Sequence, residues 1–109
     1  MPRPVFLGEF EQLVMIAILH LDNDAPVLAV RDKMEEISGR AISRTALYRT
    51  LERITEKDWV DWTVDDEERP ERGGLPRRRF RVTKQGVALL SASRKTLLTL
   101  WAGVEGKLR

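Results

Sequence analysis

Cysteine is absent from the 109-residue sequence, and histidine occurs once, as His20. Without cysteine the chain has no disulfides, thiolate metal sites or cysteine nucleophiles. A single histidine inside an apolar stretch cannot build a zinc cluster or a histidine-based catalytic pair within one subunit, so we interpret His20 as a packing or helix-end residue. The carboxylates do not pair in any stretch typical of a buried cleft. We therefore predict no metal, no cofactor and no enzymatic activity.

Long apolar runs are also missing. The longest, Leu13 to Leu19, is far shorter than the roughly 20 residues that cross a bilayer. Residues 1–9 contain no uninterrupted apolar stretch of the kind that marks a signal peptide. With 42% apolar and 33% charged residues, the composition predicts a soluble, folded chain in the cytoplasm with no membrane partner. A chain of this size forms one domain and gains useful burial from a partner subunit.

Charge is distributed unevenly, although the net charge of the whole chain is only +2. The segment from Arg69 to Lys84 carries seven basic residues against Glu71 alone, so its net charge is +6 and that of all other residues together is −4. An acidic body with one basic segment is typical of a protein that meets a polyanion at one edge. Arginine dominates the segment, which favours planar bidentate contacts.

The first predicted helix runs from about Gly8 to Leu21, because apolar residues recur there at spacings of three and four. Met15, Ile16 and Leu19 add apolar groups outside that stripe. A helix of this kind is expected to pack twice, once on its own core and once on another surface.

A turn over residues 22–26 precedes a second predicted helix, from about Pro26 to Ser38. Proline suits the start of a helix, and Gly39 is placed to end it. The apolar residues expected on its buried face are Leu28, Val30, Met34 and Ile37.

The third predicted helix, about Arg44 to Lys57, has Ser43 as its N-cap. Its core face consists of Leu47, Leu51 and Ile54. Arg44 lies close to the positive end of the helix dipole, and this unfavourable placement suggests another purpose for the charge. The residues around the start that we expect to be exposed are Ser43, Arg44, Thr45, Tyr48 and Arg49. On this pattern alone, a simple solvated helix face explains them equally well.

Two stretches alternate between apolar and polar residues, as half-buried strands do. In the first, Trp59 to Asp65, the side chains of Val60, Trp62 and Val64 point one way; in the second, Arg77 to Thr83, Phe80 and Val82 point inward and Arg77, Arg79 and Arg81 outward. The long connection between them, rich in glycine and proline, predicts a two-stranded wing.

Thr83 is placed to cap a final helix that continues almost to Arg109. The spacing of its residues is that of a heptad seam interrupted by one arginine: Val87, Leu90, Arg94, Leu97, Trp101, Val104 and Leu108. A helix of roughly 25 residues, about 37 Å long, exceeds what a domain of this size needs to cover its own core, which remains the alternative. We therefore predict a dimerisation helix with Leu90, Leu97, Trp101 and Val104 at the interface.

The element order predicts a mostly helical fold with a small β-hairpin, namely a winged helix-turn-helix over residues 1–83 followed by a dimerisation helix over residues 84–109. The third helix has the position of a recognition helix, whose start reads the major groove of DNA, and the wing arginines suit phosphates or a narrow minor groove. The residues predicted to bind double-stranded DNA are Ser43, Arg44, Thr45, Tyr48, Arg49, Arg72, Arg77, Arg78 and Arg79.

Three stretches resemble the PadR family of winged-helix transcriptional regulators: residues 7–19, residues 46–54, and Pro70-Glu71-Arg72-Gly73-Gly74 followed by residues 79–83. The single helix after the wing resembles the family's smaller subgroup. Two positions depart from the family pattern, because Pro26-Val27 replaces a Tyr-Gly pair and Asp58-Trp59 replaces a glycine followed by a smaller aliphatic residue. Aspartate tolerates the left-handed backbone less easily than glycine, so the start of the wing is expected to shift.

The resemblance implies a homodimeric repressor that binds a palindromic operator, with Tyr48 and the arginines from Arg72 to Arg79 on the DNA. It adds Leu13 and Ile16 of the first helix to the dimer interface. It also implies a small planar aromatic effector bound by Trp101, although an interface anchor is the simpler role for that residue. The alternative interpretation is a winged-helix module that binds an acidic protein partner instead of DNA.

Overall fold

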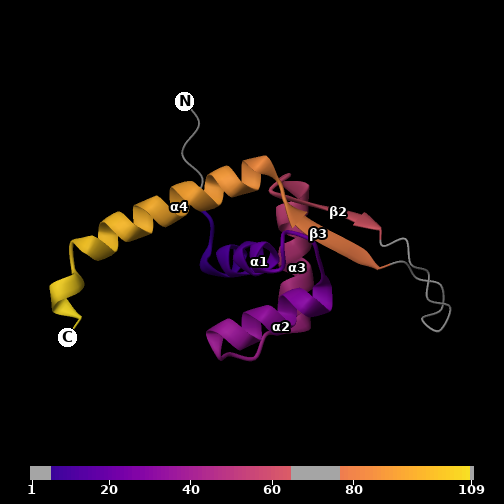
Figure 1. Ribbon diagram of the computed structural model, residues 1–109, viewed down its shortest axis with the longest axis horizontal. Helices are drawn as coiled ribbons and strands as arrows, with labels where there is room; N and C mark the ends of the chain where they lie inside the picture. Colours follow the sequence, from indigo (N-terminus) through magenta and orange to yellow (C-terminus); the bar gives the residue numbers. More distant parts are fainter. Residues whose placement is uncertain (1–5, 65–76, 109) are drawn as a thin grey trace.

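The computed structural model describes residues 6–64 and 77–108 (Figure 1). The elements in chain order are α1 (Glu9–His20), β1 (Ala25–Pro26), α2 (Val27–Ser38), α3 (Arg44–Glu56), β2 (Val60–Val64), β3 (Arg78–Val82) and α4 (Lys84–Ala102), followed by a short 3₁₀ helix, Glu105–Lys107. Figure 1 shows α4 and the β2–β3 pair extending in opposite directions from the body that α1, α2 and α3 form. The arrangement is that of a winged helix-turn-helix with one additional helix, which confirms the predicted fold class.

The helix α1 lies at the centre of the core, where it contacts α2, α3, β3 and α4. Its buried residues are Val14, Met15, Ala17 and Ile18. Ile16 and Leu19 are exposed, as the sequence predicts, whereas Met15, which the sequence places with them outside the core stripe, is fully buried in the core. His20 is exposed and ends the helix, so its role is that of a helix-end residue.

The turn between α2 and α3 is held by side chains of α2. Gly39 ends α2 in the left-handed conformation, with φ of 71°, which glycine adopts without steric cost. Arg31 Nε donates to the Ile42 carbonyl at 2.9 Å, and the Ile42 amide donates to Glu35 Oε2 at 2.8 Å. Because Ile42 is itself buried, the turn is fixed on both sides immediately before α3 begins.

Two residues predicted on the buried face of α2 are exposed instead. Val30 and Met34 are buried, whereas Leu28 and Ile37 are not. At about 100° per residue Leu28 lies on the opposite side of the helix from Val30. Ile37 is exposed beside a small cleft between α1 and α2 that Leu13 also lines. The predicted buried face of α2 was therefore wrong for Leu28 and Ile37.

The sheet has three strands in the order β1-β3-β2, all antiparallel, where the sequence predicts two. The segment predicted as a turn ends in β1, whose residues Ala25 and Pro26 pair with Phe80 and Arg79. Asn23 extends this edge with its side chain: the Val82 amide donates to Asn23 Oδ1 at 2.7 Å, and Asn23 Nδ2 donates to the Val82 carbonyl at 3.1 Å.

The two long strands are buried only where they meet the helices. Phe80, Val82 and Val60 are buried, as the alternation predicts, but Trp62 and Val64 are 40% and 46% exposed. The pair β2–β3 runs outward from the body (Figure 1), so the helices do not cover its far end. The predicted inward face of β2 is therefore correct for Val60 alone.

The end of α3 is closed by a Schellman motif, in which the Trp59 amide donates to the Ile54 carbonyl and the Asp58 amide to that of Thr55, both at 3.0 Å. Asp58 has φ of 62°. Aspartate thus takes the left-handed conformation that usually falls to glycine, and β2 begins two residues later.

The start of α4 is locked against the base of the wing. Thr83 Oγ1 accepts from the Gly86 amide at 3.1 Å and donates to the Asp58 carbonyl at 2.6 Å, which confirms the predicted cap. A Cβ added to Gly86 would collide with the carbonyl oxygen of Trp59 and lie 2.7 Å from Val82 Cγ1. Only glycine allows the helix to pass this closely.

The helix α4 is shorter than predicted. It ends at Ala102, with Gly103 as its C-cap, and the 3₁₀ turn follows. Glycines at positions 103 and 106 disfavour the helix through their backbone entropy. Val104 and Leu108, the last two members of the predicted heptad seam, therefore lie beyond α4.

Candidate nucleic-acid interface

Near its start, the exposed face of α3 carries two arginines that have no acidic partner among the described residues. Leu47, Leu51 and Ile54 turn to the core. The side chains exposed on the other side near the helix start are Arg44, Thr45, Tyr48 and Arg49. In the described part of the chain neither Arg44 nor Arg49 forms an ion pair, so their guanidinium donors are available to an external acceptor.

Ser43 fixes where that face begins. Its hydroxyl accepts from the Ala46 amide at 3.2 Å, which confirms the N-cap. The amides of Arg44 and Thr45 come before the first main-chain bond of the helix, from Leu47 to the Ser43 carbonyl. Such free amides at the positive end of a helix dipole suit a phosphate. The structure thus gives Ser43 a part in positioning the helix start.

Two arginines of β3 are engaged by acidic residues of the protein itself. Arg79 Nε lies 2.8 Å from Asp24 Oδ1, and Arg81 Nε lies 2.6 Å from Asp61 Oδ1. The hydrogen bond that Arg81 donates to Asp61, together with the negative charge of that carboxylate, raises the pKa of Arg81 above its ordinary value. The positive charge of this strand is therefore partly neutralised, and the predicted contact of Arg79 with DNA would have to compete with Asp24.

Arg78 is held differently, by aromatic rings. Its guanidinium carbon lies 5.1 Å from the centroid of the Trp62 ring and 5.6 Å from that of Phe80. Alternation along β3 places Arg78 and Phe80 on one face, while Arg77 and Arg79 lie on the other. Among the remaining predicted wing residues, Arg77 is partly exposed just before β3, and Arg72 lies outside the described residues.

A hollow of about 380 Å³ lies between α3 and the strands β2 and β3. Tyr48 and Glu52 line it from α3, and Trp62 and Arg78 line it from the strands. Trp62 is not among the residues that the sequence predicts for this site. Its signal was available in the alternation of β2, which places this aromatic residue on the face of the wing that turns to α3.

The second predicted surface, for a partner subunit, lies between α1 and α4. A groove of about 570 Å³ is lined there by Ile16 of α1 and by Arg94, Leu97 and Trp101 of α4. Leu13 is only partly buried and lines the cleft between α1 and α2. The structure brings Ile16, Leu97 and Trp101 to one groove and places Leu13 outside it, and their part in a dimer interface stays a prediction.

Two predicted interface residues are placed differently. Leu90 is 8% exposed and belongs to the hydrophobic core of its own subunit. Val104 follows the end of α4 and is exposed.

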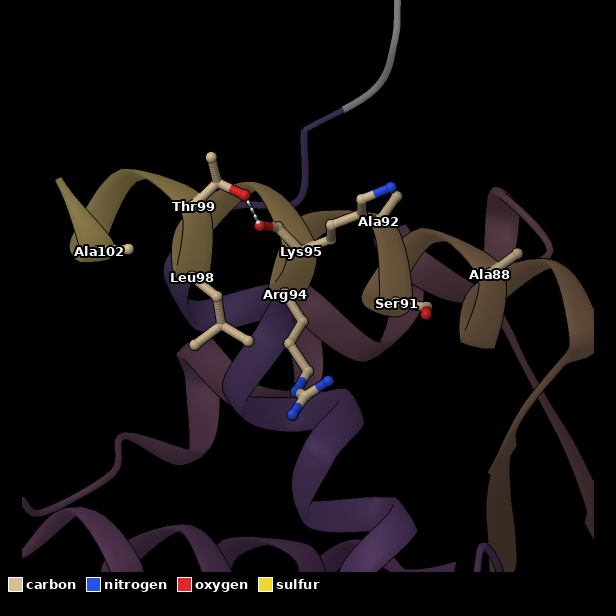
Figure 2. A pocket seen from close by; sticks show the side chains of 8 residues that line it. All are labelled: Ala88, Ser91, Ala92, Arg94, Lys95, Leu98, Thr99 and Ala102. Atoms are coloured by element: carbon tan, nitrogen blue, oxygen red, sulfur yellow. Dashed lines mark hydrogen bonds between the residues drawn. The ribbon is translucent and has the colours of Figure 1, made fainter.

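The opposite side of α4 carries small and polar side chains. Figure 2 shows Ala88, Ser91 and Ala102 along this helix, with Arg94 extending toward the side on which α1 lies. Thr99 Oγ1 donates to the Lys95 carbonyl at 2.9 Å within the helix (Figure 2). Leu97 and Trp101 thus lie on the side of α4 that faces α1, whereas Thr99 points away from it.

Other kinds of site find no support in the described ranges. Within residues 6–64 and 77–108 no group of three or more histidine, cysteine, aspartate or glutamate side chains is placed to hold a metal ion. No helix of that same part of the chain is long and apolar enough to cross a membrane.

Comparison with known proteins identifies the family of the chain. Residues 16–92 match the profile described as the transcriptional regulator PadR-like family. None of the curated protein sequences matches the chain.

Solved structures with similar folds include regulators of the same family. A PadR family transcriptional regulator from Eggerthella lenta has a TM-score of 0.71 at 23% identity, with 93% of this chain and 87% of that one covered. A PadR-like transcription factor from Bacteroides fragilis has a TM-score of 0.73 at 20% identity, covering 91% and 89%. F93 from STIV, a winged-helix DNA-binding protein, has a TM-score of 0.66 at 11% identity, covering 85% and 91%.

Proposed function

Because the chain belongs to the PadR-like family of transcriptional regulators, we propose that it binds double-stranded DNA sequence-specifically as a homodimer and represses transcription. Residues 1–83 form the DNA-binding part and residues 84–109 the dimerisation part. The observation that carries the proposal is the exposed, capped start of α3, where Arg44 and Arg49 have no acidic partner among the described residues. Such a regulator would act in the cytoplasm.

The proposed base contacts come from the start of α3. The major groove of DNA admits one helix, and side chains near the N-terminus of that helix reach base edges. Thr45, Tyr48 and Arg49 occupy this position on α3, and Tyr48 is 43% exposed. The proposed phosphate contacts come from Arg44, from the free amides beside Ser43, and from the wing arginines at 72, 77, 78 and 79.

The proposed dimer is supported by the apolar side of α4. Leu97 and Trp101 are 43% and 48% exposed on the side that turns to α1. Exposed apolar residues that gather in this way mark an interaction surface. A two-fold axis here would present two copies of α3 to two half-sites, so the operator would be a palindrome, and a bound dimer would block transcription by occupying the promoter.

A small planar aromatic effector is the further element of the proposal. The groove between α1 and α4 combines the Trp101 ring with Arg94 and aliphatic side chains. An indole offers a flat face for stacking. Binding there would alter the spacing of the two α3 helices and thereby the affinity for the operator.

Selection from a pool of randomised duplexes with the full-length protein tests the DNA-binding proposal. We expect a palindromic site to be enriched, and Arg49→Ala to weaken binding to it by about 1–3 kcal/mol with relaxed base preference. Lys95→Ala removes the same charge on α4, away from α3, and is the matched control. Binding that does not depend on salt, or retention of an acidic protein in preference to DNA, would favour the protein-interaction module instead.

A further inference from the structure

Arg78 differs from Arg79 and Arg81 of β3 because no acidic residue of the described part of the chain pairs with it. In residues 6–64 and 77–108 its partners are the rings of Trp62 and Phe80, at 5.1 and 5.6 Å. The face of an aromatic ring attracts a guanidinium that lies over it, and the N–H donors of that guanidinium remain available for hydrogen bonds. Arg78 therefore has a defined position while its donors remain free.

The two neighbouring arginines of β3 are held by carboxylates instead of rings. Arg79 directs Nε to Asp24, and Arg81 directs Nε to Asp61. A carboxylate orients an arginine by accepting its hydrogen bonds and neutralising its charge. The strand thus holds arginines by two different means, and only the aromatic one keeps the full charge available.

The place where Arg78 is held is next to the recognition helix. Arg78 and Trp62 line the same hollow as Tyr48, which stands on the exposed face of α3. Glu52 and Glu56 line that hollow as well, yet neither forms an ion pair with Arg78 in the described structure. Arg78 thus lies over the Trp62 ring although two carboxylates line the same hollow.

We propose that Trp62 is a positioning residue for DNA binding, which holds Arg78 beside α3 with its N–H groups directed to a DNA phosphate. This inference rests on the proposed function. Trp62 itself is 40% exposed and its pairing partner across the sheet is Phe80. The indole is thus a platform on the wing, anchored on one side by the buried Phe80 ring and open on the other.

The size of the effect follows from the entropy of a long side chain. Ordering a flexible arginine at an interface weakens binding by about 2- to 10-fold relative to one that is already held in place. Tryptophan is the best ring for this contact, phenylalanine a weaker one, and leucine offers no π face. The order expected for DNA affinity is therefore wild type, then Trp62→Phe, then Trp62→Leu.

The test measures anisotropy of a fluorescein-labelled mixed-sequence duplex with the full-length protein at salt concentrations from about 50 to 200 mM. We expect Arg78→Ala to reduce the slope of log K against log salt by about 0.9 for each phosphate that the protein no longer neutralises. Trp62→Leu weakens binding in the wild-type background and has no further effect when Arg78→Ala is present. Arg81→Ala, which removes an arginine already paired with Asp61, is the matched control and leaves the affinity nearly unchanged.

Several results of these measurements would overturn the proposed role of Trp62. Effects of Trp62→Leu and Arg78→Ala that multiply in the double variant overturn the inference, because Trp62 then acts independently of Arg78. Equal affinities for Trp62→Phe and Trp62→Leu overturn the role of the ring face. Normal salt-dependent binding with undiminished affinity in both variants also overturns it but leaves the proposed function standing, whereas a wild-type protein that ignores the duplex overturns both. Thermal unfolding of every variant verifies that it is folded.

Discussion

The two halves of α4 differ in what they contact. The first half contributes Gly86, Leu90 and Ser93 to the interior, and its N-terminus is tied to the end of α3 through Thr83. In residues 94–102 no side chain is buried, although three leucines and one tryptophan lie there. One continuous helix thus begins as part of the core and continues as a surface. The length of a helix alone therefore does not reveal which part belongs to the fold and which part awaits a partner.

The contrast between the two halves is tested most severely at Gly86. We expect Gly86→Ala to lower the free energy of unfolding by about 3 kcal/mol, and the Tm by roughly 10 °C, because the added Cβ meets the Trp59 carbonyl and cannot be accommodated without a backbone shift. Thermal and urea unfolding measure the change. Gly103→Ala is the control, since its Cβ would lie at an ordinary 3.5 Å from the nearest atom, the Leu100 carbonyl oxygen. Equal stability of the two variants would contradict the close packing described for the first half.

A charge in the second half should separate subunits and leave the fold intact. We expect Leu97→Glu combined with Trp101→Glu to weaken the proposed dimer by roughly 100-fold or more, because two apolar anchors are replaced by ions that would have to be desolvated. Light scattering should show the mass fall by half, while circular dichroism remains that of the folded chain. Thr99→Glu places a single added carboxylate on the side of α4 that points away from α1 (Figure 2) and is the control. An unchanged mass would remove this half of α4 from the interface.

The smallest effect is expected on the side of α4 away from α1. Thr99→Ala removes only a hydroxyl that donates to the Lys95 carbonyl within the same helix. We expect the stability to change by no more than about 0.5 kcal/mol and the oligomeric state to be unaffected. Unfolding curves at several protein concentrations measure both quantities. A larger loss of stability would indicate that this side, too, is covered in the assembled protein.

The local features of α3 were predictable from the sequence. Its N-cap Ser43 and its core residues Leu47, Leu51 and Ile54 follow from rules that operate within a few residues, and the structure confirms them. The same is true of Thr83 at the start of α4. The exposed basic face of α3 followed from the same periodicity.

The features that depend on distant parts of the chain were not predictable. The strand β1 has only two residues, too few for an alternation to appear, and it exists because β3 lies beside it. The ion pair between Asp24 and Arg79 joins residues 55 positions apart. Trp62 remains half-exposed because the helices end short of it, which the pattern of β2 alone does not indicate. Periodicity thus predicts which face of a strand turns to the core, but it does not predict how much of that face the helices bury.

Asn23 has a consequence for the behaviour of the protein in concentrated solution. Its amide side chain occupies both main-chain hydrogen-bonding groups of Val82, and β1 beside it occupies the next positions along β3. Pro26 in that short strand lacks an N–H group to offer outward. From Arg79 to Val82 this edge of β3 is therefore closed to another chain that could nucleate edge-to-edge aggregation.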